Sequence, residues 1–246
     1  AYEIMPSLVG SEMCIRDSPN SRFTAPAVNC PCVSPEFNNP DGVPVSAIIF
    51  GGRRASTTPL VYQSFDWVHG TYMGSAVSSE TTAAATGAVG VLRHDPMAMK
   101  PFIGYNVGDY WAHWLEMGEK LGDKAPKIFN VNWFKQDENG NFIWPGFGDN
   151  MRVLDWIIKR CEGKVDAVET PIGFLPKKGD INLKGIEDEV TSEVEDKLLA
   201  VDIDLWKKEI AEMRRYYNDD IKAKGGNIPQ ALYDELDKIE ARLNKA

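Results

Sequence analysis

Residues 127–150 read KIFNVNWFKQDENGNFIWPGFGDN. The first part of this stretch predicts a buried strand, because Ile128, Phe129, Val131 and Trp133 are large and apolar. A polar turn follows, and large aromatics then alternate with glycines. Glycine lets a ligand approach the backbone closely, and aromatic faces offer flat walls for a planar base. The stretch therefore predicts a core strand that leads directly into a loop suited to a planar ligand.

The aromatic loop has a second interpretation that the residues alone leave open. Its large rings are Phe142, Trp144 and Phe147, and its glycines are Gly146 and Gly148. An arbitrary loop of this kind more often folds its rings onto its own core than holds them out for a ligand. The choice between self-packing and binding depends on the rest of the chain.

Composition limits the classes of protein to which the chain can belong. The 246 residues, 43% of them hydrophobic, suit one large domain or two small ones with a real core. A net charge of −9 argues against nucleic acid or an anionic membrane as the main partner. No apolar run reaches the roughly 18 residues that cross a bilayer. Four cysteines do not make a disulfide framework, so we expect a reducing cytoplasm.

Cys30 and Cys32 are the one cysteine pair close in sequence. Metal clips usually space their cysteines more widely and need further ligands, whereas His69, His94 and His113 are scattered. Reduced thiols that pack in the protein are therefore favoured over a metal, and we expect no metal site on this chain.

The N-terminal residues 1–18 are expected to lie outside the fold. Residues 8–18, LVGSEMCIRDS, match the in-frame translation of a transposase adapter used in sequencing libraries. A secretory signal would need a basic start and a longer apolar stretch. We therefore treat residues 1–18 as an assembly scar and expect the gene product to have continued upstream of Pro19.

Patterns along the remainder predict a mixed α/β fold. Residues 45–50 read as a buried strand, and residues 60–62 and 70–74 as further short strands. Residues 78–90 are small and polar, so we expect a weakly anchored, mobile segment. The strands that begin near Val45 and Ile128 should be neighbours in a mixed sheet flanked by helices.

Helical spacing predicts helices at residues 108–121 and 150–161 and a charged helical tail at residues 179–246. Two apolar stripes in the tail are usually core, although an interaction surface remains the alternative. The stripes comprise Trp206, Ile210, Met213 and Tyr217, and then Leu232, Leu236, Ile239 and Leu243.

Arg53 and Arg54 follow the strand of residues 45–50 and two glycines. The backbone can approach an anion closely there, and a guanidinium fork can grip phosphate, although a solvated pair is equally compatible. The sequence contains neither a G-x-x-x-x-G-K-[ST] phosphate loop nor a G-x-S-x-G nucleophile elbow.

Residues 19–246 closely resemble the C-terminal lobe of GTP-dependent phosphoenolpyruvate carboxykinases. The longest matching runs are PNSRF (19–23), GVPVSAIIFGGRR (42–54), SETTAAA (79–85), DPMAMKPF (95–102), GYNVGDY (104–110), KIFNVNWF (127–134), WPGFGDN (144–150), RVLDW (152–156) and TPIGFLP (170–176). The resemblance implies a cytoplasmic, monomeric, two-lobed parent enzyme that converts oxaloacetate and GTP to phosphoenolpyruvate, GDP and CO2. It also implies that the parent requires Mn2+ or Mg2+.

The resemblance assigns a guanine pocket to the aromatic loop. Phe134, Phe142 and Phe147 are expected to wall the base, while Asn150 reads its polar edge. Arg53 is expected to contact the nucleotide phosphates.

Further assignments fall on the N-terminal part of the chain and on the small polar segment. Asn20 and Arg22 are expected to contact the substrate carboxylate and the transferring phosphoryl group, which makes Arg22 the candidate catalytic residue. Residues 81–91 correspond to the mobile lid, in which Ala88 stands where relatives often carry a basic residue.

The family's phosphate loop and metal ligands belong upstream of the position that Asn20 matches. Phosphoryl transfer depends on neutralising charge with metal and cations, so the chain as given is expected to be inactive. Two alternatives remain: a non-catalytic fragment that still binds guanine nucleotide, and a truncated reading frame with no role in a cell.

Overall fold

The structure, a computed structural model, describes residues 25–81 and 90–246. The adapter-like segment, Asn20, Arg22 and Ala88 therefore lie outside the described residues. The chain divides into two units, residues 1–44 with 81–91 and residues 45–80 with 92–246.

The first unit holds two short 3-10 helices, η1 (Ala27–Asn29) and η2 (Pro35–Asn38). Cys30 and Cys32 lie between them, with their sulfur atoms 3.5 Å apart. Both cysteines are exposed, so the expectation that these thiols pack in the protein is wrong. A turn this short has no core around it in which a thiol could be buried.

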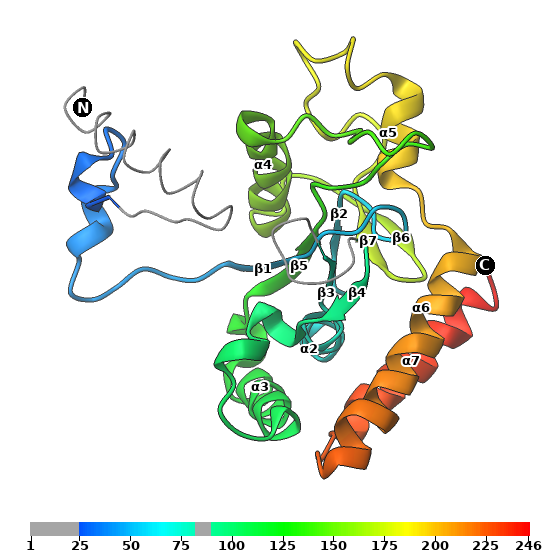
Figure 1. The fold of residues 1–246 in the computed structure, drawn as a ribbon. Helices are drawn as coiled ribbons and strands as arrows, with labels where there is room; N and C mark the ends of the chain where they lie inside the picture. Colours follow the sequence, from blue (N-terminus) through cyan, green and yellow to red (C-terminus); the bar gives the residue numbers. More distant parts are fainter. Residues whose placement is uncertain (1–24, 82–89) are drawn as a thin grey trace, which may run out of the picture. The chain divides into compact units, whose positions relative to one another are not determined.

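The second unit is built on a five-stranded mixed sheet in the order β1-β5-β2-β7-β6 (Figure 1). β1 and β5 are parallel, and the remaining pairs are antiparallel. The predicted mixed sheet, with the strands near Val45 and Ile128 as neighbours, is confirmed. The strands are β1 (Ala47–Gly51), β2 (Val61–Gln63), β5 (Lys127–Val131), β6 (Val168–Thr170) and β7 (Gly173–Leu175).

Each face of this sheet carries its own hydrophobic core. Ile128 and Tyr62 belong to one cluster, whereas their neighbours Phe129 and Val61 belong to the other. Successive side chains of a strand point to opposite faces, so a strand with no polar alternation is buried on both sides.

Helix α2 (Trp67–Ser75) occupies the place where residues 70–74 were predicted to be a strand, so that prediction is wrong. The Asp66 carboxylate caps the helix by accepting from the backbone N–H of His69 at 2.8 Å. A Cβ on Gly70 would lie 2.4 Å from Ile128, and one on Gly74 would lie 2.7 Å from Phe50. The two glycines therefore let the helix pack closely on its neighbours, and their spacing does not mark a strand.

A small two-stranded sheet joins β3 (Ser78–Glu80) to β4 (Leu92–His94), with Ser78 opposite His94. The expected mobile segment at residues 78–90 therefore starts with an ordered strand. Weak anchoring is wrong for residues 78–80, whereas residues 82–89 lie outside the described part of the chain.

The predicted helices of the middle of the chain are confirmed as α3 (Val107–Leu121) and α4 (Asn150–Cys161). Both apolar stripes of the tail are buried, so core packing is confirmed as the role of those residues. α6 and α7 pack along each other (Figure 1). The tail comprises α5 (Ser192–Leu199), α6 (Ile203–Arg215), the π-helix η7 (Tyr216–Ile221), η8 (Lys222–Lys224) and α7 (Gln230–Leu243).

Four more 3-10 helices complete the described elements, and they are η3 (Pro96–Ala98), η4 (Lys100–Phe102), η5 (Gly122–Lys124) and η6 (Phe147–Asp149). Within the described ranges, no helix combines the length and the apolar character needed to cross a bilayer.

Candidate functional site

A pocket of about 210 Å³ lies where β1 and β5 end. The two strands run parallel with Gly51 opposite Val131, so the residues that follow them meet at one edge of the sheet. Ligands of open α/β sheets bind at such carboxyl edges. The residues that line the pocket are Gly51, Gly52, Arg53, Ser79, Val131, Trp133 and Phe134.

Arg53 borders this pocket and is held there by β3. Its backbone N–H donates to Ser79 Oγ at 3.1 Å, and its Nε donates to the carbonyl of Glu80 at 3.4 Å. Its guanidinium carbon lies 6.0 Å from the centre of the Phe134 ring. A Cβ on Gly52 would meet the carbonyl oxygen of Ser78 at 2.3 Å, so only glycine lets the two backbones approach this closely.

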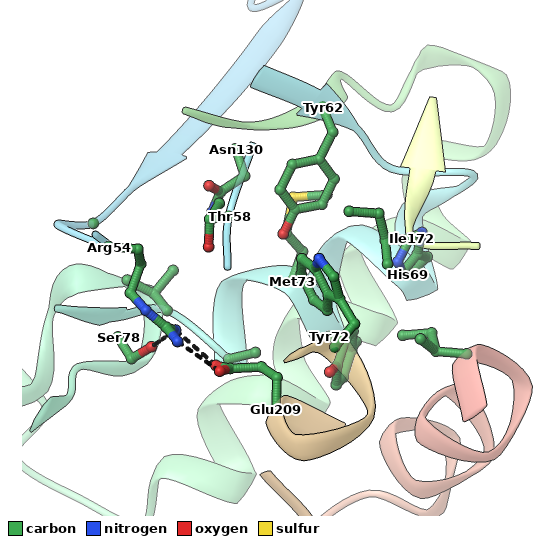
Figure 2. Close-up of a pocket in the computed structure, with 15 residues that line it drawn as sticks. Arg54, Thr58, Tyr62, His69, Tyr72, Met73, Ser78, Asn130, Ile172 and Glu209 are labelled. Atoms are coloured by element: carbon green, nitrogen blue, oxygen red, sulfur yellow. Dashed lines mark hydrogen bonds and ion pairs between the residues drawn. The ribbon is translucent and has the colours of Figure 1, made fainter. Parts of the chain in front are cut away.

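The guanidinium of Arg54 is bound to Ser78 and Glu209 (Figure 2), which are not partners of Arg53. Its Nη1 and Nη2 donate to the two carboxylate oxygens of Glu209 at 2.7 and 2.6 Å. Nη1 also donates to Ser78 Oγ at 2.7 Å. Burial alone would lower the pKa of this guanidinium, but the hydrogen bond and the charge of Glu209 outweigh burial and raise the pKa. Arg54 is therefore bound within the protein, and the alternative of a solvated arginine pair is wrong for it.

Asn132 connects the two strand ends that form the pocket. Its Oδ1 accepts from the backbone N–H of Arg54 and from that of Phe134, each at 3.2 Å. Its Nδ2 donates to the carbonyls of Arg54 at 2.8 Å and of Thr58 at 2.9 Å. One buried amide thus satisfies four backbone groups. No pattern in the sequence singles out Asn132, whose only signal is its place directly after a buried strand.

The aromatic loop brings two of the three predicted rings together. Phe134 and Phe142 meet edge to face, with ring centres 5.8 Å apart. A tight turn closes the loop behind them, because Asp137 Oδ1 accepts from the backbone N–H groups of Asn139 and Asn141. The backbone N–H and the side-chain amide of Asn141 both donate hydrogen bonds to the Asp137 carboxylate. These bonds, the backbone one most, lower the pKa of that carboxyl.

Trp144 is the ring that follows the self-packing interpretation. It is only 2% exposed, whereas Phe142 is 59% exposed. Its Nε1 donates to Asn150 Oδ1 at 2.8 Å. An indole nitrogen can only donate, so this bond fixes which end of the Asn150 amide is the oxygen. The Nδ2 end of Asn150 then remains as a hydrogen-bond donor.

Phe147 is held out into solvent by an unusual backbone. The side chain is 98% exposed, and its φ of +48° is a conformation that side chains other than glycine rarely adopt. Within the described part of the chain, Phe147 makes no ring contact with Phe134 or Phe142. Outliers of this kind cluster at ligand sites, where the surrounding structure must maintain them.

A partly open cavity of about 40 Å³ is lined by Arg54, Tyr62 and His69, among other residues (Figure 2). It has room for one or two water molecules. Burial lowers the pKa of His69, which lines it, to about 3, and the charges of Arg242 and Lys238 act in the same direction. The cavity is therefore a structural feature beside a neutral histidine.

Among residues 25–81 and 90–246, no three His, Cys, Asp or Glu side chains come together as a possible metal site. The candidates Asn20 and Arg22 lie outside these ranges, so their placement stays a prediction.

Comparison with known proteins gives the family. The family model "Phosphoenolpyruvate carboxykinase C-terminal P-loop domain" matches residues 10–242, a range that begins inside the adapter-like segment. Over 92% of this chain, identity is 50% to the "Phosphoenolpyruvate carboxykinase [GTP]" of Chlamydia caviae and 53% to that of Renibacterium salmoninarum. The chain spans 37% and 36% of the lengths of these curated relatives. By these matches, the chain belongs to the family of GTP-dependent phosphoenolpyruvate carboxykinases, as part of their C-terminal P-loop domain.

Proposed function

We propose that this chain forms the guanine-nucleotide pocket of an enzyme that converts oxaloacetate and GTP to phosphoenolpyruvate, GDP and CO2. The observation that carries the proposal is the pocket at the ends of β1 and β5, where Arg53 lies 6.0 Å from the ring of Phe134. A guanidinium fork for phosphates thus stands beside an aromatic surface for the base.

Asn150 gives the pocket a means of choosing guanine. Its Nδ2 can donate a hydrogen bond, because Trp144 occupies its oxygen. Guanine presents the acceptors O6 and N7 on one edge, whereas adenine places a donor amino group beside N7. A donor that faces O6 therefore favours GTP over ATP, while Phe134, Phe142 and Phe147 form the apolar walls.

The remaining assignments extend to the parent enzyme. Asn20 and Arg22 would contact the substrate carboxylate and the transferring phosphoryl group, with Arg22 as the catalytic residue. A divalent Mn2+ or Mg2+ supplies charge neutralisation to phosphoryl transfer when it is bound. This chain's own part is to bind and orient the nucleotide through Arg53 and Phe134, which line the same pocket. We further propose that the parent enzyme is a monomer and that it works in a reducing cytoplasm.

Tryptophan fluorescence tests nucleotide binding directly. Trp133 lines the pocket, and Trp144 is bonded to Asn150. Titration with GTP should change the emission, and the same concentration of ATP should change it far less. Phe142→Ala should weaken the GTP response, whereas Phe102→Ala, which removes another exposed ring, should not. Equal responses to GTP and ATP would contradict the proposed pocket.

Turnover is the second test. We expect the purified chain to release no CO2 from oxaloacetate in the presence of GTP and Mn2+, while it still binds GTP. Measurable decarboxylation above the metal-only background would show that the chain needs no further part of its family's fold.

A further inference from the structure

Helix α6 places two carboxylates, one helical turn apart, at the base of the β3–β4 hairpin. Glu209 binds Arg54, which in turn donates to Ser78 Oγ on β3. Glu212 lies 3.2 Å from the Nε2 of His94 on β4. Because Ser78 and His94 are directly paired, the tail meets both strands of the hairpin at the same level.

The same hairpin holds the backbone that presents Arg53 to the pocket. The N–H of Glu80 donates to the carbonyl of Arg53 at 2.9 Å, and the N–H of Ala55 donates to Glu80 Oε1 at 3.0 Å. The N–H of Arg53 donates to Ser79 Oγ. Residues 53–55 are thus connected to β3 on one side and to Asn132 on the other.

The ion pair between Arg54 and Glu209 is well shielded from water. Each side chain is 11% exposed, and the two groups meet through two parallel hydrogen bonds. A buried guanidinium that loses its carboxylate cannot stay where it is without a large penalty. The side chain of Arg54 would have to turn toward water. It would then lose its contact with Ser78, and the backbone of Arg53 would shift with it.

We propose that Glu209 is a positioning residue for nucleotide phosphates: through Arg54 it fixes the segment that presents Arg53 to the pocket. The inference rests on the proposed function, and it makes the C-terminal helical tail a part of the phosphate site. The base pocket depends on Glu209 less directly, because Asn150 is bound by Trp144 and Phe142 meets the ring of Phe134, and only the Phe134 N–H shares Asn132 with Arg54.

The test compares two ligands that differ only in phosphate. GTP reports on both halves of the pocket, and guanosine reports on the base half alone. Glu209→Gln should weaken GTP binding about tenfold or more, which is the effect of losing one charged hydrogen-bonded contact, and should leave guanosine affinity unchanged. Glu209→Asp, which keeps the charge, should restore part of the GTP affinity.

The matched control is Glu240→Gln, because Glu240 likewise pairs with an arginine, Arg214, but lies on the exposed surface. It should alter neither affinity. If Glu209→Gln weakens GTP and guanosine by the same factor, or weakens neither, the positioning role is wrong. If the unaltered chain binds neither ligand, the proposed function fails by itself.

Hydrogen exchange gives a readout that needs no ligand. In Glu209→Gln, the backbone amides of residues 53–55 should exchange faster, while those of β5 should not. Unchanged exchange at residues 53–55 would overturn the inference whatever the binding data show. Should the glutamine variant lose its circular-dichroism spectrum, Glu209→Asp serves for the same comparison.

Discussion

Two adjacent arginines with the same chemistry have different roles because their partners differ. Arg53 borders the pocket beside Phe134, whereas Arg54 is bound to Glu209 and Ser78. The residue pattern predicted an anion site at this pair without dividing it, and the family resemblance singled out Arg53 alone. The division depends on a glutamate 155 residues away, which no local pattern identifies.

The orientation of a single amide leads to the first prediction. Asn150→Asp keeps an acceptor for the Trp144 indole N–H but replaces the Nδ2 donor with a carboxylate oxygen. That oxygen would repel guanine O6 and attract the amino group of adenine. We expect the ratio of GTP to ATP affinity to fall about tenfold or more, as loss of one hydrogen bond at a buried polar edge would cause.

Titration of the two nucleotides by calorimetry measures this ratio. The control is Asn182→Asp, which adds the same charge at a residue whose carbonyl, and not its side chain, bonds to Arg152. An unchanged ratio in Asn150→Asp would remove this residue from the guanine pocket.

His69 makes stability depend on pH. Its Nδ1 accepts from the backbone N–H of Phe65 at 3.0 Å, and burial lowers its pKa to about 3. An unfolded histidine has a pKa near 6.5, so below that pH the unfolded chain takes up a proton that the folded chain does not. Stability from this residue is therefore complete above pH 6.5 and is lost as pH falls toward 3.

Between pH 7 and pH 5 this loss is about 2 kcal/mol. His69→Asn keeps an acceptor for Phe65 but cannot titrate in this range, so its stability should fall less over the same interval. The comparison is the difference between urea unfolding free energies at the two pH values. Equal pH differences in both proteins would mean that His69 takes up its proton as readily in the folded state as in the unfolded chain.

At the scale of elements, periodic segments were predictable and the glycine-spaced helix was not. α3 and α4 carry apolar residues at helical spacing over three or more turns, and β5 carries the large apolar residues Ile128, Phe129 and Val131. α2 contains Gly70 and Gly74, which lower its helix propensity. In the sequence, these glycines look like the residues that bound short strands at both ends. Its helical state depends on packing against β5 and β1, which only the tertiary structure provides.

Gly70→Ala tests that packing. The added methyl would lie 2.4 Å from Ile128 in the core, so we expect a loss of about 1–3 kcal/mol in the free energy of unfolding. Gly104→Ala is the matched control, because a Cβ there has open space around it. That change should be neutral or slightly stabilising through the unfolded chain. Similar losses in both variants would contradict the close contact of α2 with β5.

At the scale of the whole molecule, β1 is one of the two edge strands of the five-stranded sheet, and β6 is the other. In the described part of the chain β1 pairs with β5 alone, and its Ile49 is 40% exposed. A groove of about 360 Å³ lies beside it, lined by Ile48, Trp67, Tyr110, His113, Trp114, Met117, Leu121 and Pro126. Exposed edges and apolar grooves of this kind promote association.

We therefore expect the isolated chain to self-associate as its concentration rises. Ile49→Lys should reduce association, measured by light scattering, because a charge on an edge strand blocks strand pairing. Ile158→Lys adds the same charge at an exposed isoleucine of α4 and should have little effect. If both variants reduce association equally, net charge and not the β1 edge is responsible.

The bond between Arg54 and Glu209 also sets an order of events during synthesis. The ribosome adds about 5–20 residues per second, so the 155 residues between them take about 8 to 30 s to make. During that time Arg54 has been synthesised, but Glu209, which supplies its carboxylate partner, has not. The nucleotide pocket can therefore reach its final form only after α6 has left the ribosome. A nascent chain that stalls before residue 209 would keep Arg54 in water and the pocket unfinished.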